Sequence, residues 1–555
     1  MHRMAVSIGY RKRGQRSGAL WLACAIAMAL LVLLPITALF VQAMQGSAGL
    51  WLHLLENVLP IALRDTVILL IGVGILAAVL GTSLAWLVTA YDFPGRGMLE
   101  WALLLPLAVP TYIIAYAYLD ILHPIGSVQG AIRWILGYTS PREFRLPDIR
   151  SMAGCIILLG FVLYPYVYIP TRAMFLTQSG NLLDAARTLG ISRRGLFWHL
   201  ALPLARPAVA VGVSLALMET LNDVGAAEFL GVRTLTVSIY TTWITRNDLP
   251  GAAQIALALL LVVVTLVALE RWARRRQRYS TGAQRHQRFE PHRPSPIKGW
   301  LLFAAGALPI LIGFIAPALY LSSEAWKRVQ FAGLSERFFA EAFNTIVLAL
   351  LATICTLAAG LALAYANRLR PGPISTWSYR VSTLGYAAPG SVVALGVLIA
   401  LATFDQAIDR AATTWLGFAT GLLFMGSGLA LVYAYIVRFL AISAGGIDSG
   451  LARIPASLDQ ASRLLGQTAT GTFVRVHLSL SRAALTAAGL LVFVDCVKEL
   501  PATLLLRPLN LETFATHLYG EAARGTYEEA SIAALAIVAI GILPVIFLSR
   551  VGRTG

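Results

Sequence analysis

The chain has 555 residues, of which 58% are hydrophobic and only 13% charged, and its mean hydropathy is +0.73. A soluble globular chain carries about 25% charged residues, so this composition excludes a soluble protein, which needs more polar side chains to cover its surface. The formal net charge of +17 is concentrated in two basic segments, 2–16 and 270–298, which favours a role in membrane topology over nucleic-acid binding.

Apolar stretches of about 20 residues, long enough to cross the hydrocarbon core, recur twelve times along the chain. The first run is longer than the about 7–15 apolar residues of a cleaved signal peptide, so it predicts a retained helix. The sequence therefore predicts an all-α polytopic membrane protein with about 12 transmembrane helices. The twelve predicted spans are 19–43, 66–90, 99–121, 152–175, 206–228, 251–270, 299–322, 344–367, 379–403, 416–440, 483–506 and 529–549.

Basic loops fix the predicted orientation, because short loops rich in Lys and Arg stay cytoplasmic. The N-terminus and the segment 271–298 are both basic, and six predicted spans separate them. We therefore expect both chain termini and this segment on the cytoplasmic side. The four cysteines all fall in predicted spans without CxxC spacing, which indicates core residues and not disulfides or ligands; they are Cys24, Cys155, Cys355 and Cys496.

The two halves of the chain repeat each other. With a shift of 276 residues, 11 of the 27 positions in 182–208 are identical to those in 458–484, and earlier in the halves the best shift is 279. Six spans per half make the repeats parallel, related by an axis along the membrane normal. We predict a first six-helix half at 1–270, a basic cytoplasmic linker at 271–298 and a second half at 299–555. Pro110 and Pro389 align in the third spans, where they are expected to kink the helices as a matter of packing shape.

Both copies of the strongest repeat fall between the fourth and fifth spans of their half, on the predicted cytoplasmic side. Apolar residues recur there at helical spacing, a glycine follows where helices commonly end in a left-handed residue, and a second helical piece carries a phenylalanine. In the first copy, Leu202–Pro203 is expected to break that second piece before the next span. A helix this short is marginal in water, so docking in a groove of a cytoplasmic partner would stabilise it. The alternative is an amphipathic connector lying on the bilayer, which the duplication makes less favoured.

These loops resemble the EAA loop of ABC-transporter permeases. That pattern is roughly E-A-A, three residues, Gly, nine residues, an aliphatic residue, one more, and Leu-Pro. "DAARTLG" (184–190) matches it with Asp184 in the acid position, whereas "QASRLLG" (460–466) has Gln460 there, with Asp459 adjacent. The resemblance implies that the coupling residues are Asp184, Ala185, Ala186, Gly190, Phe197 and Pro203 in the first copy and Asp459, Gln460, Ala461, Gly466 and Phe473 in the second.

The whole chain is similar to the fused double permeases of ferric-iron importers, most specifically in "FVDCVKELPATLLLRP" (493–508) and "ALMETLNDVGAAEFLGV" (216–232). The resemblance implies the type I ABC importer permease fold in a bacterial inner membrane. It also implies two copies of a cytoplasmic ATP-binding subunit, an extracytoplasmic substrate-binding protein and ATP-driven alternating access. Thiamine permeases and some sulfate or phosphonate permeases share this architecture, so thiamine or another small solute stays an alternative substrate.

The fifth span of each half carries charge at membrane depth, which is costly unless the group faces a cavity or a partner. We expect these residues to line the pathway and to favour a cation such as Fe³⁺, which prefers oxygen ligands, without forming a resident metal site. The alternative is structural pairing, for instance between Lys498 and Glu499. The candidate pathway residues are Glu219, Asp223, Asp495, Lys498 and Glu499.

The sequence has only four lysines, none of them in a GxxxxGK[ST] phosphate loop, and no GxSxG or HExxH motif. We therefore expect no enzymatic activity and no bound cofactor in this chain, with ATP and Mg²⁺ on the partner subunit. A rival from another class is an ion-coupled secondary transporter with two parallel six-helix halves. The helix count permits this rival, and the matched loops argue against it.

Overall fold

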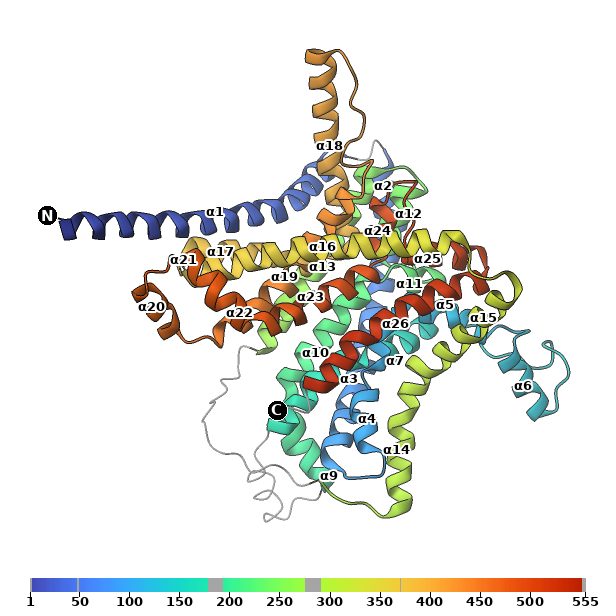
Figure 1. Ribbon diagram of the computed structural model, residues 1–555. Helices are drawn as coiled ribbons and strands as arrows, with labels where there is room; N and C mark the ends of the chain where they lie inside the picture. Colours follow the sequence, from blue (N-terminus) through green and yellow to red (C-terminus); the bar gives the residue numbers. More distant parts are fainter. Residues whose placement is uncertain (1, 47–48, 178–192, 275–290, 370, 552–555) are drawn as a thin grey trace. The chain divides into compact units, whose positions relative to one another are not determined.

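The computed structural model describes residues 2–46, 49–177, 193–274, 291–369 and 371–551 (Figure 1). Within these ranges the regular structure is helical, apart from an isolated bridge between Tyr91 and His292. Ten of the described helices are long and apolar enough to cross a bilayer, and two helix pairs bent by 91° and 75° raise this number to twelve. The prediction of an all-α protein with about twelve spans is confirmed.

Contacts divide the chain into two compact units. The first unit comprises 1–48, 247–257 and 336–516, and the second comprises 49–246, 258–335 and 517–555. Two helices, α13 (Leu249–Arg274) and α25 (Phe514–Arg524), begin in residues of the first unit and end in residues of the second. The predicted sequence halves are therefore not the compact units, and the division at 271–298 stays a prediction about the repeat.

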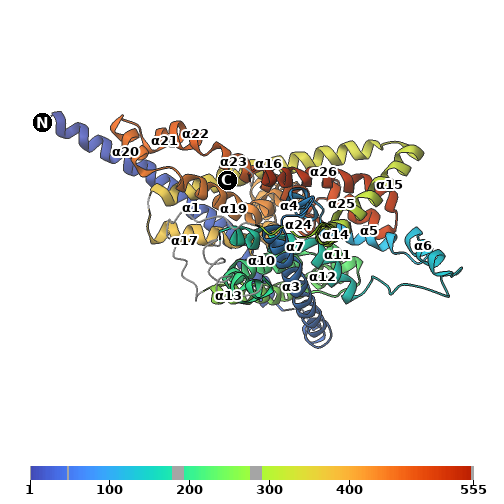
Figure 2. The same cartoon turned by 90° about the horizontal axis from the view of Figure 1, so that it is seen from below.

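In the first unit, α1 (His2–Met44) lies against α16, α17 and α18, and α19 packs on α16 and α23 (Figures 1 and 2). The first helix of the chain thus packs against helices of the second sequence half. The other helices of this unit are α16 (Glu336–Leu369), α17 (Pro373–Ser382), η5 (Leu384–Tyr386), α18 (Gly390–Leu416), α19 (Leu429–Ala452), α20 (Ala456–Leu464), α21 (Ala469–Thr472), η6 (Phe473–His477), α22 (Leu478–Leu480), α23 (Arg482–Val497) and α24 (Pro501–Leu506).

In the second unit, α3 packs on α7 and α10, and α15 packs on α26. Its core includes Ile310 and Val545 beside residues of α3, α4 and α7. The helices of this unit are α2 (Leu50–His53), η1 (Leu54–Val58), α3 (Leu59–Ala90), α4 (Arg96–Ala102), η2 (Leu105–Ala108), α5 (Thr111–Ile121), α6 (Ser127–Leu136), α7 (Met152–Thr177), α9 (Arg193–Leu196), η3 (Phe197–Ala201), α10 (Leu202–Asn222), α11 (Gly225–Phe229), α12 (Leu235–Ile244), α14 (Pro296–Ile310), η4 (Leu311–Ile315), α15 (Ala316–Ala332) and α26 (Tyr527–Val551).

The sequence repeat is also a repeat of local structure. Thr66 on α3 accepts a hydrogen bond from the backbone N–H of Leu235 at 3.0 Å. Thr345 on α16 accepts one from Phe514 at the same distance, and both residues are shifted by 279. The π-helical turns η3 and η6 are related by the shift of 276 that aligns the loops. The two copies therefore fold alike in detail.

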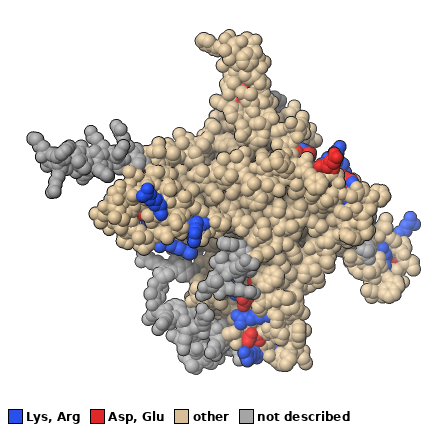
Figure 3. Space-filling view, viewed as in Figure 1, with Lys and Arg blue, Asp and Glu red and all other residues tan. Residues whose placement is uncertain are grey.

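The same repeat appears in the exposed apolar residues of α3 and α16. Apolar residues on α3 are exposed at spacings of one, three and four, which is one face of a helix, and the equivalent positions of α16 are exposed as well. Charged side chains are sparse in the space-filling view, as expected for a surface in contact with lipid (Figure 3). The exposed residues are Val67, Ile68, Ile71 and Ile75 on α3 and Ile346, Val347, Leu350 and Ile354 on α16.

The two prolines predicted to kink the third spans interrupt the helix completely, and a new helix begins directly after each proline. Pro110 and Pro389 adopt extended backbone (ψ 142° and 147°) and directly precede α5 and α18. The carbonyl of each accepts the first backbone bonds of the new helix. At Pro110 the flanking helices differ in direction by 91°.

Two predicted spans are placed wrongly. The ninth and tenth were expected at 379–403 and 416–440, whereas the helices are α18 and α19, each about a dozen residues further along. Asp405 and Asp409 lie beyond the predicted end of the ninth span at residue 403, and charges inside a span are costly. Instead both carboxylates accept backbone N–H groups of the following loop, at 2.7–3.1 Å, and α18 continues to Gly417.

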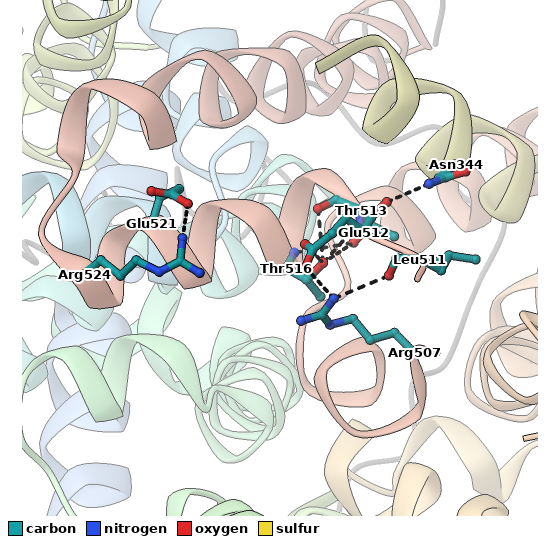
Figure 4. A network of polar contacts seen from close by, with 8 residues as sticks. All are labelled: Asn344, Arg507, Leu511, Glu512, Thr513, Thr516, Glu521 and Arg524. Carbon is teal, nitrogen blue, oxygen red and sulfur yellow. Dashed lines mark hydrogen bonds and ion pairs between the residues drawn. The ribbon is translucent and has the colours of Figure 1, made fainter. Parts of the chain in front are cut away.

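A polar network attaches the loop between α24 and α25 to α16 (Figure 4). Arg507 donates to the Glu512 carboxylate at 2.5 Å, and the Asn344 amide donates to the backbone carbonyl of Glu512 at 3.1 Å. Thr516 also donates to this carboxylate. The network holds the start of α25 next to Thr345.

The close helix crossings in both units depend on glycine. A Cβ on Gly81 of α3 would lie 2.8 Å from the carbonyl oxygen of Tyr164 and 2.9 Å from the nitrogen of Tyr168 on α7. A Cβ on Gly360, the equivalent position of α16, would lie 2.2 Å from Ser443 Oγ on α19. Both crossings are therefore as close as helix backbones allow, the arrangement that small residues permit in membrane proteins.

We expect Gly81→Ala to lower the free energy of unfolding in detergent by about 1–3 kcal/mol, because the helices must move apart. Gly445→Ala is the matched control, since a Cβ there meets no atom within 4 Å. Unfolding followed by tryptophan fluorescence checks this, and equal stability of the two variants would contradict the close crossing.

Candidate functional site

The second copy of the repeated loop is anchored through Asp459 on α20. Its carboxylate pairs with the Arg368 guanidinium at the end of α16, at 2.9 Å, and is hydrogen-bonded to Nε2 of His477. Arg368 also donates to the carbonyls of Leu451 and Ile454, where α19 ends. His477 is fully buried. One carboxylate thus fastens α20 to α16 and η6.

The end of α20 is a glycine turn, as the sequence predicts. Gly466 has φ +78°, and the N–H of Gln467 donates to the carbonyl of Ser462 at 3.1 Å, which is the bonding of a Schellman motif. Leu464 and Leu465 are 89% and 80% exposed beside this turn. Gln460 and Ala461 are exposed too. The loop therefore presents an apolar surface while its acidic side faces the rest of the chain.

The phenylalanines of the two copies sit on equivalent aromatic residues. Phe473 contacts Tyr365, with ring centroids 4.7 Å apart, and Phe197 contacts Trp86 at 5.3 Å. Tyr365 and Trp86 are related by the 279 shift, so both loops are attached to the corresponding helix in the same way. Of the first copy, the predicted coupling residues Asp184, Ala185, Ala186 and Gly190 lie outside the described residues.

The prediction that the helix breaks at Leu202–Pro203 is wrong. Pro203 lies in the first turn of α10, where a missing N–H is tolerated, and the helix runs on from η3 without interruption. The bend occurs in the second copy, which has Ser479 and Ala483 where the first copy has Pro203 and Pro207. The helices before and after Ser481 differ in direction by 75°. Ser481 Oγ donates to the carbonyl of His477, a back-bond that often bends helices.

Two of the predicted pathway acids cap short helices. Asp223 accepts the N–H of Ala226 at 2.8 Å, at the start of α11. Glu499 accepts the N–H of Ala502 at 3.0 Å, at the start of α24. Both acids are buried, and both pairs are related by the 276 shift. Each carboxylate therefore stabilises the break that follows the fifth span of its half.

The surroundings of these two acids differ. The Glu499 carboxylate pairs with the Arg438 guanidinium at 3.3 Å, with side-chain exposures of 2% and 11%. This pairing requires Gly390, because a Cβ there would lie 2.0 Å from Arg438 Nη1. In the first copy the position equivalent to Gly390 is Thr111, near Asp223, and Asp223 Oδ2 is buried without a hydrogen-bond partner among the described residues. Glu499 thus has an arginine partner in the second copy, whereas Asp223 in the first copy is held by the backbone N–H of Ala226.

The remaining predicted pathway residues also have partners. Asp495 and Lys498 form an ion pair at 2.8 Å, each about one quarter exposed. The Glu219 carboxylate accepts the Tyr166 hydroxyl at 3.3 Å. The structural alternative of the sequence analysis therefore describes the observed contacts, although Lys498 pairs with Asp495 and Glu499 with Arg438. A role of these five residues in the pathway stays a prediction.

Sequence reasoning missed three basic residues of these sites: Arg368, His477 and Arg438. Arg438 lies inside the predicted tenth span, and a charge at that depth is itself a signal of a buried partner. Arg368 and His477 gave no such signal, because they fall at the ends of helices where charge is ordinary.

Comparisons with known proteins fit this architecture. Residues 71–279 match the family described as "Binding-protein-dependent transport system inner membrane component". The chain is 23% identical over 493 residues, 88% of its own length and 89% of the relative, to the "Fe(3+)-transport system permease protein FbpB 2" of Haemophilus influenzae. Shorter relatives match about one half of it. The "Sulfate transport system permease protein CysT" of Salmonella typhimurium is 27% identical over 43% of this chain and 85% of its own. The "Molybdenum transport system permease protein ModB" of Escherichia coli is 28% identical over 36% of this chain and 87% of its own.

Fold, repeat and comparisons agree: residues 71–279 match the inner-membrane component family of binding-protein-dependent transport systems, and the chain is similar over most of its length to a permease of the ABC type that carries two repeats. The expectation drawn from the EAA-type loops is confirmed at the level of this family.

Proposed function

We propose that this chain supplies both membrane-spanning halves of an ABC importer, and that it moves ferric iron from an external binding protein to the cytoplasm. ATP hydrolysis takes place in two copies of a separate cytoplasmic subunit. Closure of these subunits moves the two repeated loops and opens the pathway outward, and hydrolysis reverses the movement. The chain itself contributes no catalytic residue and binds no cofactor.

The observation that carries this proposal is the attachment of the two loops. Each is joined to its half by the same aromatic contact, Phe197 on Trp86 and Phe473 on Tyr365. In the second copy the Asp459–Arg368 pair adds a charged contact, while Leu464 and Leu465 stay exposed. A helix fastened on one side and apolar on the other suits transmission of force from a groove in a soluble partner.

The orientation expected from the basic segments is part of the same proposal. With both termini cytoplasmic, both repeated loops are cytoplasmic, where an ATP-binding partner is expected. The end of the basic linker is held on this side, since Arg293 pairs with Asp92 at 3.0 Å, just after α3.

Ferric iron is the proposed cargo because the relative that matches 88% of the chain is a permease for Fe(3+), whereas the sulfate and molybdenum relatives match single halves. Uptake of sulfate, molybdate or thiamine in place of iron is the outcome that would reassign the substrate.

Coupling is tested by co-purification. The chain is expressed with the candidate ATP-binding subunit of its transporter, and the ATPase recovered with Leu464→Asp/Leu465→Asp is compared with the ATPase recovered with wild type. We expect recovery to fall at least about tenfold, because both exposed apolar contacts are lost and charge is introduced at the proposed interface. Leu509→Asp is the control, since Leu509 is fully exposed between α24 and α25. Equal recovery of both variants would contradict the coupling role of α20.

A further inference from the structure

Tyr240 on α12 and Tyr519 on α25 are equivalent positions of the repeat, related by the 279 shift, and they touch each other. Their ring centroids are 6.3 Å apart at an interplanar angle of 82°, and their side chains are hydrogen-bonded. Two equivalent residues can meet only where the two copies face each other across the axis that relates them. For parallel copies this axis runs along the membrane normal, which is the direction of transport.

The carboxylate of Glu228 is hydrogen-bonded to one tyrosine of this pair. The Tyr519 hydroxyl donates to Glu228 Oε2 at 2.5 Å, and the neighbouring Phe229 packs against the Tyr519 ring at 5.5 Å. Glu228 is only partly buried. The position equivalent to it at the 276 shift is Leu504, so one copy alone supplies the acid.

Glu228 differs from two of the four acids that the sequence analysis proposed, Glu499 and Asp495, and is like Glu219, which accepts the Tyr166 hydroxyl. Glu499 pairs with Arg438 and Asp495 with Lys498, so these two carboxylates are neutralised within the protein. In the part of the chain that the structure describes, the partner of Glu228 is a tyrosine hydroxyl and not an arginine or lysine. Its negative charge is therefore balanced by no neighbouring cation of the described chain.

We propose that Glu228, Tyr240 and Tyr519 form an oxygen-lined constriction of the pathway that contacts a hard metal cation during its passage. This inference rests on the proposed function. One carboxylate and two phenol oxygens are the donors that a hard cation prefers. Among the described residues no group of three or more His, Cys, Asp and Glu could hold a metal ion. A small set of donors suits a cargo that must be released again.

The first test measures uptake of ⁵⁵Fe³⁺ by proteoliposomes that contain the chain, its ATPase and the loaded binding protein. We expect Glu228→Gln to lower the initial uptake rate about tenfold, the effect of losing one interaction of a charged group, with ATP hydrolysis still stimulated by the binding protein. Tyr519→Phe is also expected to lower the initial uptake rate, but by less than Glu228→Gln. Glu529→Gln and Tyr138→Phe are matched controls, because both side chains are exposed on the surface. Uptake by Glu228→Gln equal to that of Glu529→Gln would overturn the proposal.

A second test does not depend on the carboxylate. Cysteines replace Tyr240 and Tyr519 in a chain whose four native cysteines are replaced by serine. If the constriction must open, an oxidative cross-link should stop uptake and a reductant should restore it, while each single-cysteine variant is unaffected by the oxidant. Continued uptake by the cross-linked chain would overturn the proposal. Failure of the wild-type chain to take up iron under these conditions would instead reject the proposed function.

Discussion

Replacing Asp459 by alanine is expected to uncouple the chain from its ATPase while leaving the membrane part folded. The substitution removes the carboxylate that pairs with Arg368 and is hydrogen-bonded to the buried His477. Hydrogen bonds to charged groups contribute about 1.5–3 kcal/mol each, so seating of α20 should weaken enough to lower uptake at least about tenfold. Uptake and co-purified ATPase are measured together in the same membranes.

The matched comparison for this variant is Gln460→Ala. Gln460 occupies the acid position when the second loop is aligned with the EAA pattern, but its side chain is exposed and the neighbouring Asp459 makes the contacts. Gln460→Ala should therefore retain far more uptake than Asp459→Ala. The reverse order would show that the sequence alignment and not the observed ion pair identifies the important residue.

Removing one partner of the buried Arg438–Glu499 pair is expected to destabilise the chain strongly. Arg438→Met leaves the carboxylate buried without its cation, which costs about 3–5 kcal/mol. In the double variant Arg438→Met/Glu499→Gln neither charge remains. The free energy of unfolding that this variant loses should therefore be smaller than the sum of the losses in the two single variants. Denaturation in detergent of wild type, both single variants and the double variant provides the complete cycle.

Asp495→Asn/Lys498→Met is the control for this cycle. Its pair is about one quarter exposed and should contribute no more than about 1 kcal/mol. Strict additivity of the Arg438 and Glu499 effects would contradict a structural ion pair. A loss of uptake by Glu499→Gln at unchanged stability would favour the pathway role that the sequence suggested.

Local rules predicted well those features that depend on neighbours in sequence. Apolar runs predicted the helical membrane fold, and glycine after a short apolar stripe predicted the left-handed turn at Gly466. The shift of 276 predicted that the loops are alike, and their π-turns and phenylalanine contacts agree.

Features that depend on partners distant in sequence were not predictable in the same way. Hydropathy cannot distinguish the end of a span from a helix whose carboxylates fold a loop back, and so α18 and α19 were misplaced. Alignment with the motif places Gln460 in the acid position, whereas the neighbouring Asp459 makes the ion pair with Arg368. A sequence motif does not contain the information on which side chain Arg368 contacts. The packing of α1 with the second sequence half likewise has no local signature.

Reconstitution of transport tests the central claim most directly. Proteoliposomes containing the purified chain, its ATPase and the iron-loaded binding protein should accumulate ⁵⁵Fe³⁺ only when ATP is present on the side of the ATPase. Accumulation by the chain alone, driven by a proton or sodium gradient without any ATPase, would contradict the account and identify a secondary transporter.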